Sequence, residues 1–250
     1  MGELALTGWL WLALAGVLVG VAKTALNGVG SIAVVIFAAV LPARESTGAI
    51  LPLLLCGDVI AVTWYRRHAD WSTMWRLIPG VLPGLLLGAW FLSVVDDMLM
   101  RRTIAITLLV MCTVQTWQLL RGADLAAIGS TPHSHGLMTF GTGATAGFAT
   151  MTANAAGPIT TIYLIRAGLP MLRMIGTGAW FYLLVNLAKV PFSAGLGLIT
   201  PTSLVRDALL VPALLVGAVL GILLVRRLRQ RQFEVAALGF SAATAVLLLL

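Results

Sequence analysis

Long apolar runs constrain the fold of this chain more than any other feature of its sequence. A helix needs about 20 apolar residues to cross the hydrocarbon core of a bilayer. Six runs of about that length occur among the 250 residues, at 47–66, 73–95, 101–120, 172–194, 204–226 and 232–250. The chain is 60% hydrophobic and only 10% charged, whereas a soluble domain carries about 25% charged residues. We therefore expect an all-α polytopic membrane protein, and we exclude a soluble enzyme and a disordered chain.

Two further apolar regions are interrupted by short breaks rich in polar residues and glycine. Region 4–41 breaks at residues 23–30, and region 136–168 breaks at residues 152–158. The arms that follow the breaks have 11 residues each, at 31–41 and 158–168. Eleven helical residues extend about 17 Å, roughly half the thickness of a membrane. We predict that each region is a re-entrant, discontinuous helical hairpin with its tip near the midplane.

The two halves of the chain resemble each other at an offset of 128 to 129 residues. Gly28 matches Gly157, and Asp58 matches Asn186. The order of one hairpin and three spans also occurs twice. Each half makes three net crossings, an odd number, so the second half begins on the opposite side and the repeats are inverted. The predicted units are a first repeat over 1–121, a cytoplasmic connecting loop over 122–135 and a second repeat over 136–250.

The distribution of the arginines supports this topology. If the loop at Arg66-Arg67-His68 is cytoplasmic, the loops at 121–135, 166–173 and 226–231 are cytoplasmic too. Those four loops and their flanks hold ten arginines, and the opposite side holds four, Arg44, Arg101, Arg102 and Arg206. This bias obeys the positive-inside rule and places both termini outside. The net charge of +7 is therefore a topology signal, and we expect no nucleic-acid partner.

Few ionisable groups lie within the apolar segments. The only two lysines of the chain, Lys23 and Lys189, are among them, and Asp58 is the only acid placed deep inside a full span. Such groups are costly in a membrane, so each one is a candidate functional residue. Tyr182 and Asn186 are spaced from Lys189 so that all three share one helix face. Pro191 follows and frees the carbonyl of Leu187.

The breaks add features that suit an anion. Asn27 and Ser31 can cap the helix after the first tip, and Pro158 suits the first turn of the helix after the second. Each tip would then present a half-helix N-terminus with free N–H groups and a positive dipole end, which bind anions. The candidate substrate-binding residues are Lys23, Thr24, Asn27, Gly28, Thr152, Asn154, Gly157, Tyr182, Asn186 and Lys189.

Structural roles for the same residues stay open. Asp58 is either a proton carrier or the counter-ion of Lys189, and in the second case the two form a structural ion pair. Lys23 can instead neutralise carbonyl groups at its own tip, and the broken helices can serve packing alone. Glycine ladders such as Gly80-x3-Gly84-x3-Gly88 favour helix packing and allow a monomer or a homodimer.

No cofactor or metal site is expected. Cys56 and Cys112 lie in apolar runs without ligand spacing. His133 and His135 occur in a loop without a third ligand. The aromatic residues around the Arg66-Arg67 loop predict an interfacial belt. They are Trp64, Tyr65, Trp71 and Trp75.

Several motifs together resemble those of the sulfite exporter TauE/SafE family. In the first half they are Lys23-Thr24-Ala25-Leu26-Asn27-Gly28-Val29-Gly30, Leu41-Pro42-Ala43-Arg44-Glu45, Leu53-Leu54-Leu55-Cys56-Gly57-Asp58 and Tyr65-Arg66-Arg67-His68. In the second half they are Ala155-Ala156-Gly157-Pro158 and Asn186-Leu187-Ala188-Lys189-Val190-Pro191. The likeness covers nearly the whole chain and supports central roles for Lys23, Asn27, Asp58, Asn186 and Lys189. The chain departs from the usual family pattern at Ala25 and at Thr152-Ala153-Asn154.

The resemblance implies a bacterial inner-membrane transporter of a sulfur-containing anion: sulfite, sulfoacetate or an organosulfonate. We therefore expect a secondary transporter that works by alternating access, with a small anionic substrate, with or without a coupled proton, and lipid as its surroundings. The alternatives are a transporter of a small carboxylate or another anion, and a passive anion channel. An intramembrane enzyme lacks the necessary residue pairs, and a scaffold has no need of charges at the midplane.

Overall fold

The computed structural model describes residues 5–25, 29–120 and 136–225, and this part of the chain is helical without any strand. The elements of the first half are α1 (Leu6–Thr24), α2 (Gly30–Val40), α3 (Ala43–Ala49), α4 (Leu51–Tyr65), η2 (Arg66–His68), α5 (Trp71–Val94) and α6 (Asp97–Leu120). Those of the second half are α8 (Gly136–Ala153), α9 (Gly157–Arg166), α10 (Met171–Gly195) and α11 (Pro201–Val225). The predicted loop 122–135, with its histidines, and the predicted span 232–250 lie outside the described residues.

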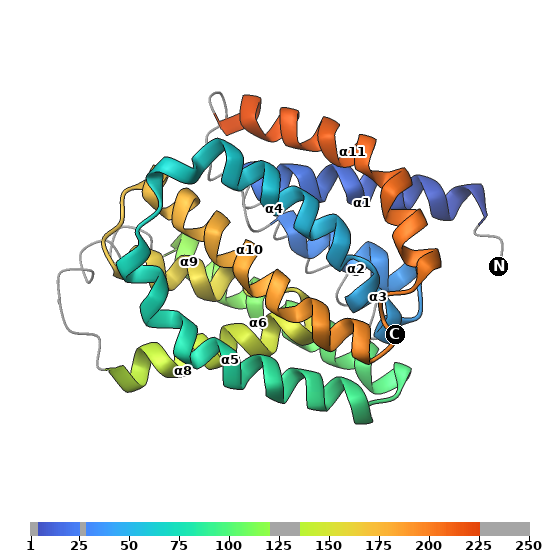
Figure 1. The fold of residues 1–250 in the computed structure, drawn as a ribbon, viewed down its shortest axis with the longest axis horizontal. Coiled ribbons are helices and arrows are strands. Elements are labelled where there is room, and N and C mark those ends of the chain that lie inside the picture. Colours follow the sequence, from blue (N-terminus) through green and yellow to red (C-terminus); the bar gives the residue numbers. More distant parts are fainter. Residues whose placement is uncertain (1–4, 26–28, 121–135, 226–250) are drawn as a thin grey trace.

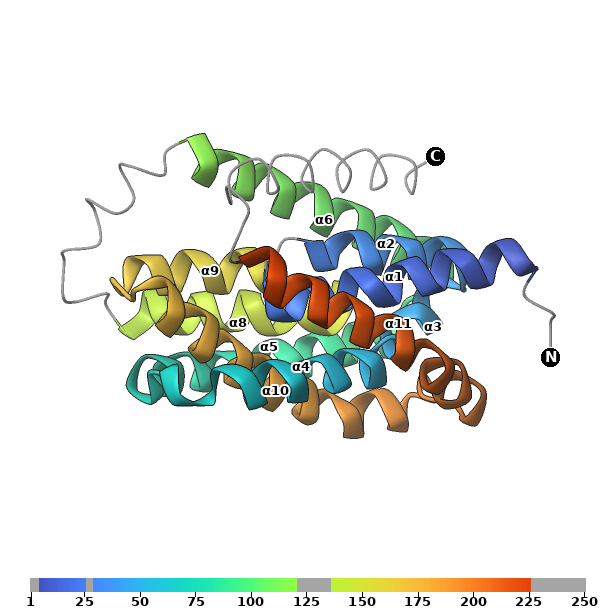
Figure 2. The same ribbon diagram turned by 90° about the horizontal axis from the view of Figure 1, so that it is seen from above.

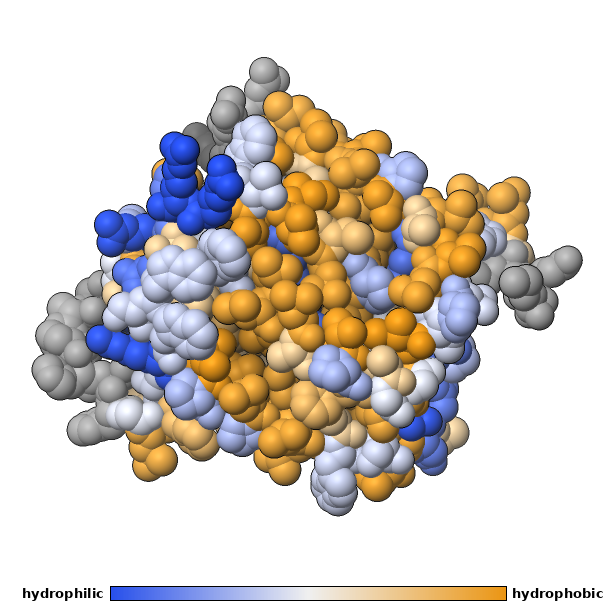
Figure 3. All heavy atoms as spheres, in the orientation of Figure 1, coloured by the Kyte–Doolittle hydropathy of each residue, from blue (hydrophilic) through white to orange (hydrophobic). Residues whose placement is uncertain are grey.

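Much of the surface is apolar, as a protein surrounded by lipid requires. Figure 3 shows a broad band of hydrophobic side chains across the middle of one face. Large apolar side chains such as Leu87, Trp90 and Val219 are more than half exposed. Four of the described helical segments are long and apolar enough to cross a membrane, at Leu6–Thr24, Ala43–His68, Trp71–Val94 and Pro201–Leu223. Two further long helices, α6 and α10, carry more polar residues and fall outside this group.

Two close helix pairs join the halves of the chain. In Figure 1, α11 packs along α1 at one edge, and α5 packs along α8 at the opposite edge. Both pairs rely on glycines that allow backbones to touch. A Cβ atom on Gly84 would lie 2.1 Å from the carbonyl oxygen of Ala144, and one on Gly217 would lie 2.0 Å from that of Val17. Each pair therefore combines a helix from one half with a helix from the other.

The two broken regions fold as a long helix followed by a short one. The first is α1 followed by the 11-residue α2, and the second is α8 followed by the 10-residue α9. Pro158 occupies the first turn of α9, as predicted. The expected cap by Ser31 is wrong, because α2 begins one residue earlier, at Gly30, and its N-cap Val29 makes no side-chain capping bond. Asn27 and Gly28 lie outside the described residues.

Helices α4 and α10 lie side by side between the two edge pairs (Figure 1) and carry the buried residues Asp58, Asn186 and Lys189. Seen from above in Figure 2, α6 lies on the side of the molecule away from α4 and α10. Pro191 lies inside α10, as expected. The prediction of an interfacial role for Tyr65 is wrong: the side chain is buried, and its hydroxyl donates to the carbonyl of Thr24 at 3.0 Å. Trp64, Trp71 and Trp75 are exposed.

Candidate functional site

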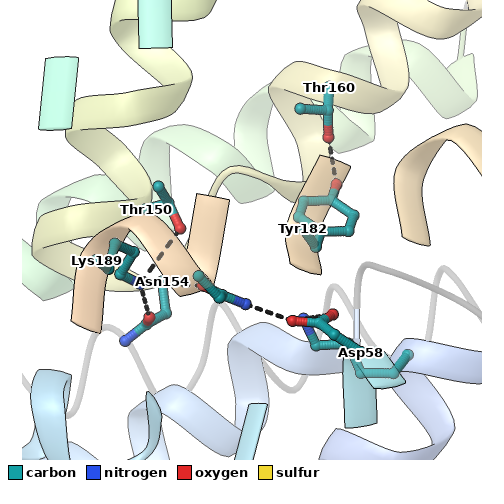
Figure 4. Close-up of polar contacts among 8 residues, drawn as sticks. Asp58, Thr150, Asn154, Thr160, Tyr182 and Lys189 are labelled. Carbon is teal, nitrogen blue, oxygen red and sulfur yellow. Dashed lines mark hydrogen bonds and ion pairs between the residues drawn. The ribbon is translucent and has the colours of Figure 1, made fainter. Parts of the chain in front are cut away.

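A buried polar cluster lies where α1, α4, α8 and α10 meet (Figure 4). Asp58 on α4 is at its centre, with Lys23 from the end of α1 on one side. Helix α10 contributes Tyr182, Asn186 and Lys189, which face inward because they are spaced along one side of the helix. All five side chains lie in helices and come from the sequence-predicted set.

Asp58 accepts contacts from both halves of the chain. Its Oδ1 lies 2.6 Å from the Nζ atom of Lys23, and its Oδ2 accepts a hydrogen bond of 2.6 Å from the Nδ2 atom of Asn186. The Asp58 side chain is fully buried, and 11% of the Lys23 side chain is exposed. A cation and an amide donor together offset the cost of burying a carboxylate at this position. The expected counter-ion, Lys189, does not make this ion pair.

Lys189 has polar neighbours but no carboxylate partner among the described residues. Its ammonium donates to Oδ1 of Asn154, to Oδ1 of Asn186 at 3.4 Å and to the hydroxyl of Thr150 at 3.5 Å. Only 1% of its surface is exposed. With both lysines protonated and Asp58 ionised, the cluster holds one positive charge more than it has negative charges. A buried ammonium without a counter-ion is costly, and binding of an anion would remove that cost.

Asn154 holds the second break in place. It adopts φ of +49°, a left-handed conformation that asparagine tolerates better than most residues. Its Nδ2 atom donates to the carbonyl of Thr47 in α3 at 3.1 Å, while its Oδ1 accepts from Lys189. The turn that ends α8 therefore presents an amide to the cluster and is tied to the first half of the chain.

Tyr182 connects the cluster to the short helix α9. Its hydroxyl forms a short hydrogen bond with the hydroxyl of Thr160 (Figure 4). Its ring lies beneath the Nζ atom of Lys23, which is 5.0 Å from the ring centroid. An ammonium at this distance over an aromatic face gains a cation–π interaction. Tyr182 therefore helps to fix the position of Lys23 relative to α9.

A cavity of about 50 Å³ lies beside the cluster. Its polar lining comes from Lys23, Thr150, Asn154, Tyr182 and Asn186. Gly30 and Gly157, the first residues of the two short helices, also line it. Both short helices therefore begin at the cavity wall, as anion binding at half-helix N-termini requires. A second cavity of about 20 Å³ lies on the other side of Lys23 and Tyr182, next to Asp58.

The sequence-predicted residues divide into those that reach the cavity and those that do not. Lys23, Asn154, Gly157, Tyr182 and Asn186 line it, and Lys189 lies behind Asn154 and Asn186. Two others, Thr24 and Thr152, donate hydrogen bonds from their hydroxyls to backbone carbonyls instead.

Thr24 donates to the carbonyls of Gly20 and Ala218, and Thr152 donates to that of Phe148.

Sequence reasoning missed Thr150 and Thr160. The spacing of Thr150 four residues before Asn154 was the available signal, because it places both on one face of a helix.

The described residues contain no group of three or more histidine, cysteine, aspartate or glutamate side chains that could hold a metal ion. The chemistry available to the cluster is therefore that of ammonium groups, amides, hydroxyls and one paired carboxylate. These groups can bind and orient an anion. They provide no nucleophile with an adjacent base.

Comparison with known proteins identifies one family. The family model described as sulfite exporter TauE/SafE matches residues 12–248, nearly the whole chain. No curated protein and no solved structure matches the chain.

Proposed function

Since the chain belongs to the sulfite exporter TauE/SafE family and is therefore a multi-pass membrane transporter, we propose that it carries a sulfur-containing anion across the bacterial inner membrane by alternating access. The substrate would be sulfite, sulfoacetate or an organosulfonate. The anion would bind beside Lys23 and Lys189, between the first turns of α2 and α9, near the midplane.

The observation that carries this proposal is the uncompensated charge of Lys189. The side chain is buried with only 1% of its surface exposed, and no carboxylate in the described part of the chain pairs with it. Placing an unpaired ammonium in a membrane interior is unfavourable and is retained where function needs it. A monovalent anion would bring the net charge of the cluster to zero.

The helix ends and the cavity support an anion of small size. The N-terminal residues of α2 and α9, Gly30 and Gly157, line the cavity, so their helix dipoles add positive potential to that of the lysines. A cavity of about 50 Å³ is well below the roughly 300 Å³ that sites for drug-sized ligands need. In this conformation the site therefore favours an inorganic oxyanion over an aryl sulfonate.

Alternating access requires two parts that can move relative to each other around the site. The α1–α11 and α5–α8 pairs each join one helix from either half, as expected for inverted repeats related by an axis in the membrane plane. In this arrangement α1–α2 and α8–α9 are re-entrant hairpins whose breaks meet at the axis. The two hairpins would exchange access to the cavity while α4 and α10 hold the charged residues.

A carboxylate or another small anion is the second candidate substrate, because ammonium groups and helix N-termini also bind carboxylates. A passive anion channel is the third candidate function. Flux that saturates and shows counterflow would exclude a channel, and competition by sulfonates against carboxylates would separate the two substrate classes.

The first experiment measures thermal unfolding of the detergent-purified protein with sulfite, sulfate, sulfoacetate, an aryl sulfonate and matched carboxylates. We expect one sulfur anion to stabilise the protein by about 2.7 kcal/mol at about 100 times its Kd. The variant Lys189→Gln should lose this stabilisation. Arg101→Gln, which removes an exposed positive charge on α6, should keep it. Stabilisation by carboxylates alone, or an equal response in Lys189→Gln, would overturn the proposal.

A further inference from the structure

A second carboxyl group, outside the cluster, is buried in the described structure. Asp207 lies in the second turn of α11, with 4% of its surface exposed. The helix begins just before it, where Thr200 and Ser203 cap each other through reciprocal hydrogen bonds of 2.9 and 3.0 Å. Its carboxyl lies at the contact between α11 and α4, close to the backbone of Leu53 and to Cys56.

Neither oxygen of Asp207 has a hydrogen-bond partner in the described part of the chain. The carboxyl faces the backbone N–H of Leu53 in the first turn of α4, without a hydrogen bond of normal geometry. Burial of a carboxylate in this state would leave its charge uncompensated, whereas a protonated carboxyl is neutral.

Among residues 5–25, 29–120 and 136–225, no charged neighbour of Asp207 lies at ion-pair distance from its carboxyl. Arg206, next to it on α11, instead extends toward Glu45 of α3, with 3.9 Å between Nη1 and Oε1. From α4, Cys56 faces Asp207. The one charged residue of α1, Lys23, lies at the far end of that helix and pairs with Asp58.

The two buried carboxyls of the described chain thus differ in one decisive way. Asp58 lies 2.6 Å from an ammonium and accepts an amide hydrogen bond, so partners are in place to compensate a negative charge. Asp207 has neither. Two turns of α11 separate it from Leu214, which packs against Gly57 beside Asp58.

We propose that Asp207, and not Asp58, is the proton-binding carboxyl of this transporter. It holds a proton while α4 and α11 are packed together. When the two helices separate, water reaches the carboxyl and it releases the proton as hydronium. It takes up a proton from water again before the contact closes. The coupling role rests on the proposed transport function, whereas the protonated state of Asp207 does not.

Infrared spectroscopy of the purified protein at neutral pH tests the protonated state. A protonated carboxyl gives a C=O stretching band distinct from the bands of carboxylates. We expect such a band in the wild type, its loss in Asp207→Asn, a shifted band in Asp207→Glu, and no change in Glu45→Gln. The proposal is wrong if the wild type lacks the band, or if Asp207→Asn retains it.

Proteoliposomes test the coupling. We expect a pH gradient to drive anion accumulation in the wild type but not in Asp207→Asn, while anion counterflow without a gradient persists in both. Gradient-driven accumulation by Asp207→Asn equal to that of the wild type would overturn the coupling role. A wild type that neither binds nor moves any anion would instead contradict the proposed function, and the infrared result would stand independently.

Discussion

Asn186 donates a hydrogen bond of 2.6 Å to the carboxylate of Asp58, although 128 residues separate the two in the chain. The same separation relates the two halves of the sequence, so these residues occupy equivalent positions in the proposed repeats. In the inverted arrangement that we propose, equivalent residues can touch only at the axis that relates the repeats. The polar cluster therefore forms where the halves meet, and we expect substitutions there to affect both halves.

Asp58→Asn should strongly destabilise the protein without ligand. The substitution leaves the ammonium of Lys23 buried without its carboxylate, and breaking a buried ion pair from one side costs about 3–5 kcal/mol. The double variant Asp58→Asn/Lys23→Met should recover much of that loss, because no unpaired charge remains. Unfolding in increasing concentrations of a denaturing detergent measures the stability of the single and the double variant. If Asp58→Asn alone is as stable as the wild type, the ion pair between Lys23 and Asp58 contributes nothing to stability.

The glycine contacts between helices predict that two glycine-to-alanine substitutions change stability in opposite directions. Gly84→Ala would place a Cβ atom 2.1 Å from the carbonyl oxygen of Ala144, so α5 and α8 must separate, at a cost of about 1–3 kcal/mol. Gly141→Ala on α8 has no atom within 4 Å of the new Cβ and should be neutral or stabilise the helix by up to about 1 kcal/mol. Thermal unfolding of the two variants compares them directly, and equal midpoints would contradict the described packing.

Tyr182 and Thr160 should be energetically coupled through their shared hydrogen bond. Tyr182→Phe keeps the ring beneath Lys23 but removes the hydroxyl, and Thr160→Val removes its partner. A double-mutant cycle on thermal stability should give a coupling of about 0.5–1.5 kcal/mol. Additive effects of the two substitutions would mean that α10 and α9 are not linked at this point.

Asp70 should make stability depend on pH at the start of α5. It caps the helix by accepting from the backbone N–H of Thr73 at 2.9 Å, and this bond lowers the pKa of the Asp70 carboxyl. Because the folded pKa lies below the unfolded one, the contribution is complete above about pH 4 and is lost as the pH falls through the folded pKa.

The variant Asp70→Asn separates the charge from the cap. It keeps an accepting side chain, since asparagine caps helices as well as aspartate, but it cannot titrate. We expect its unfolding midpoint to change less than that of the wild type between neutral and acidic pH. Identical acid sensitivity of the two proteins would exclude Asp70 as a source of that dependence.

Much of the architecture followed from the pattern of apolar residues alone. The two breaks lie where the polar and glycine residues interrupt the apolar regions, and Pro158 lies in the first turn of α9, as its fixed φ angle predicts. Asn186 and Lys189 were recognised because polar residues at membrane depth stand out against their surroundings. The spacing of Tyr182 from them then placed all three on one face.

The partners of these residues could not be predicted, because sequence does not give the rotation of one helix against another. Lys23, not Lys189, pairs with Asp58. Tyr65 has the amphipathic character of an interfacial residue, but its side chain turns inward to Thr24. Asp207 was overlooked because it lies only four residues into its predicted span, where acids are normally exposed, and only the packing of α11 on α4 buries it.

The most direct test of the account is uptake of a labelled sulfur-containing anion by proteoliposomes that contain the wild type, Lys189→Gln or Arg101→Gln. We predict saturable uptake with counterflow in the wild type and in Arg101→Gln, and none in Lys189→Gln, which should still insert and remain folded by thermal unfolding. Uptake by Lys189→Gln at the wild-type rate, or flux that does not saturate, would contradict a carrier built around the buried charge of Lys189.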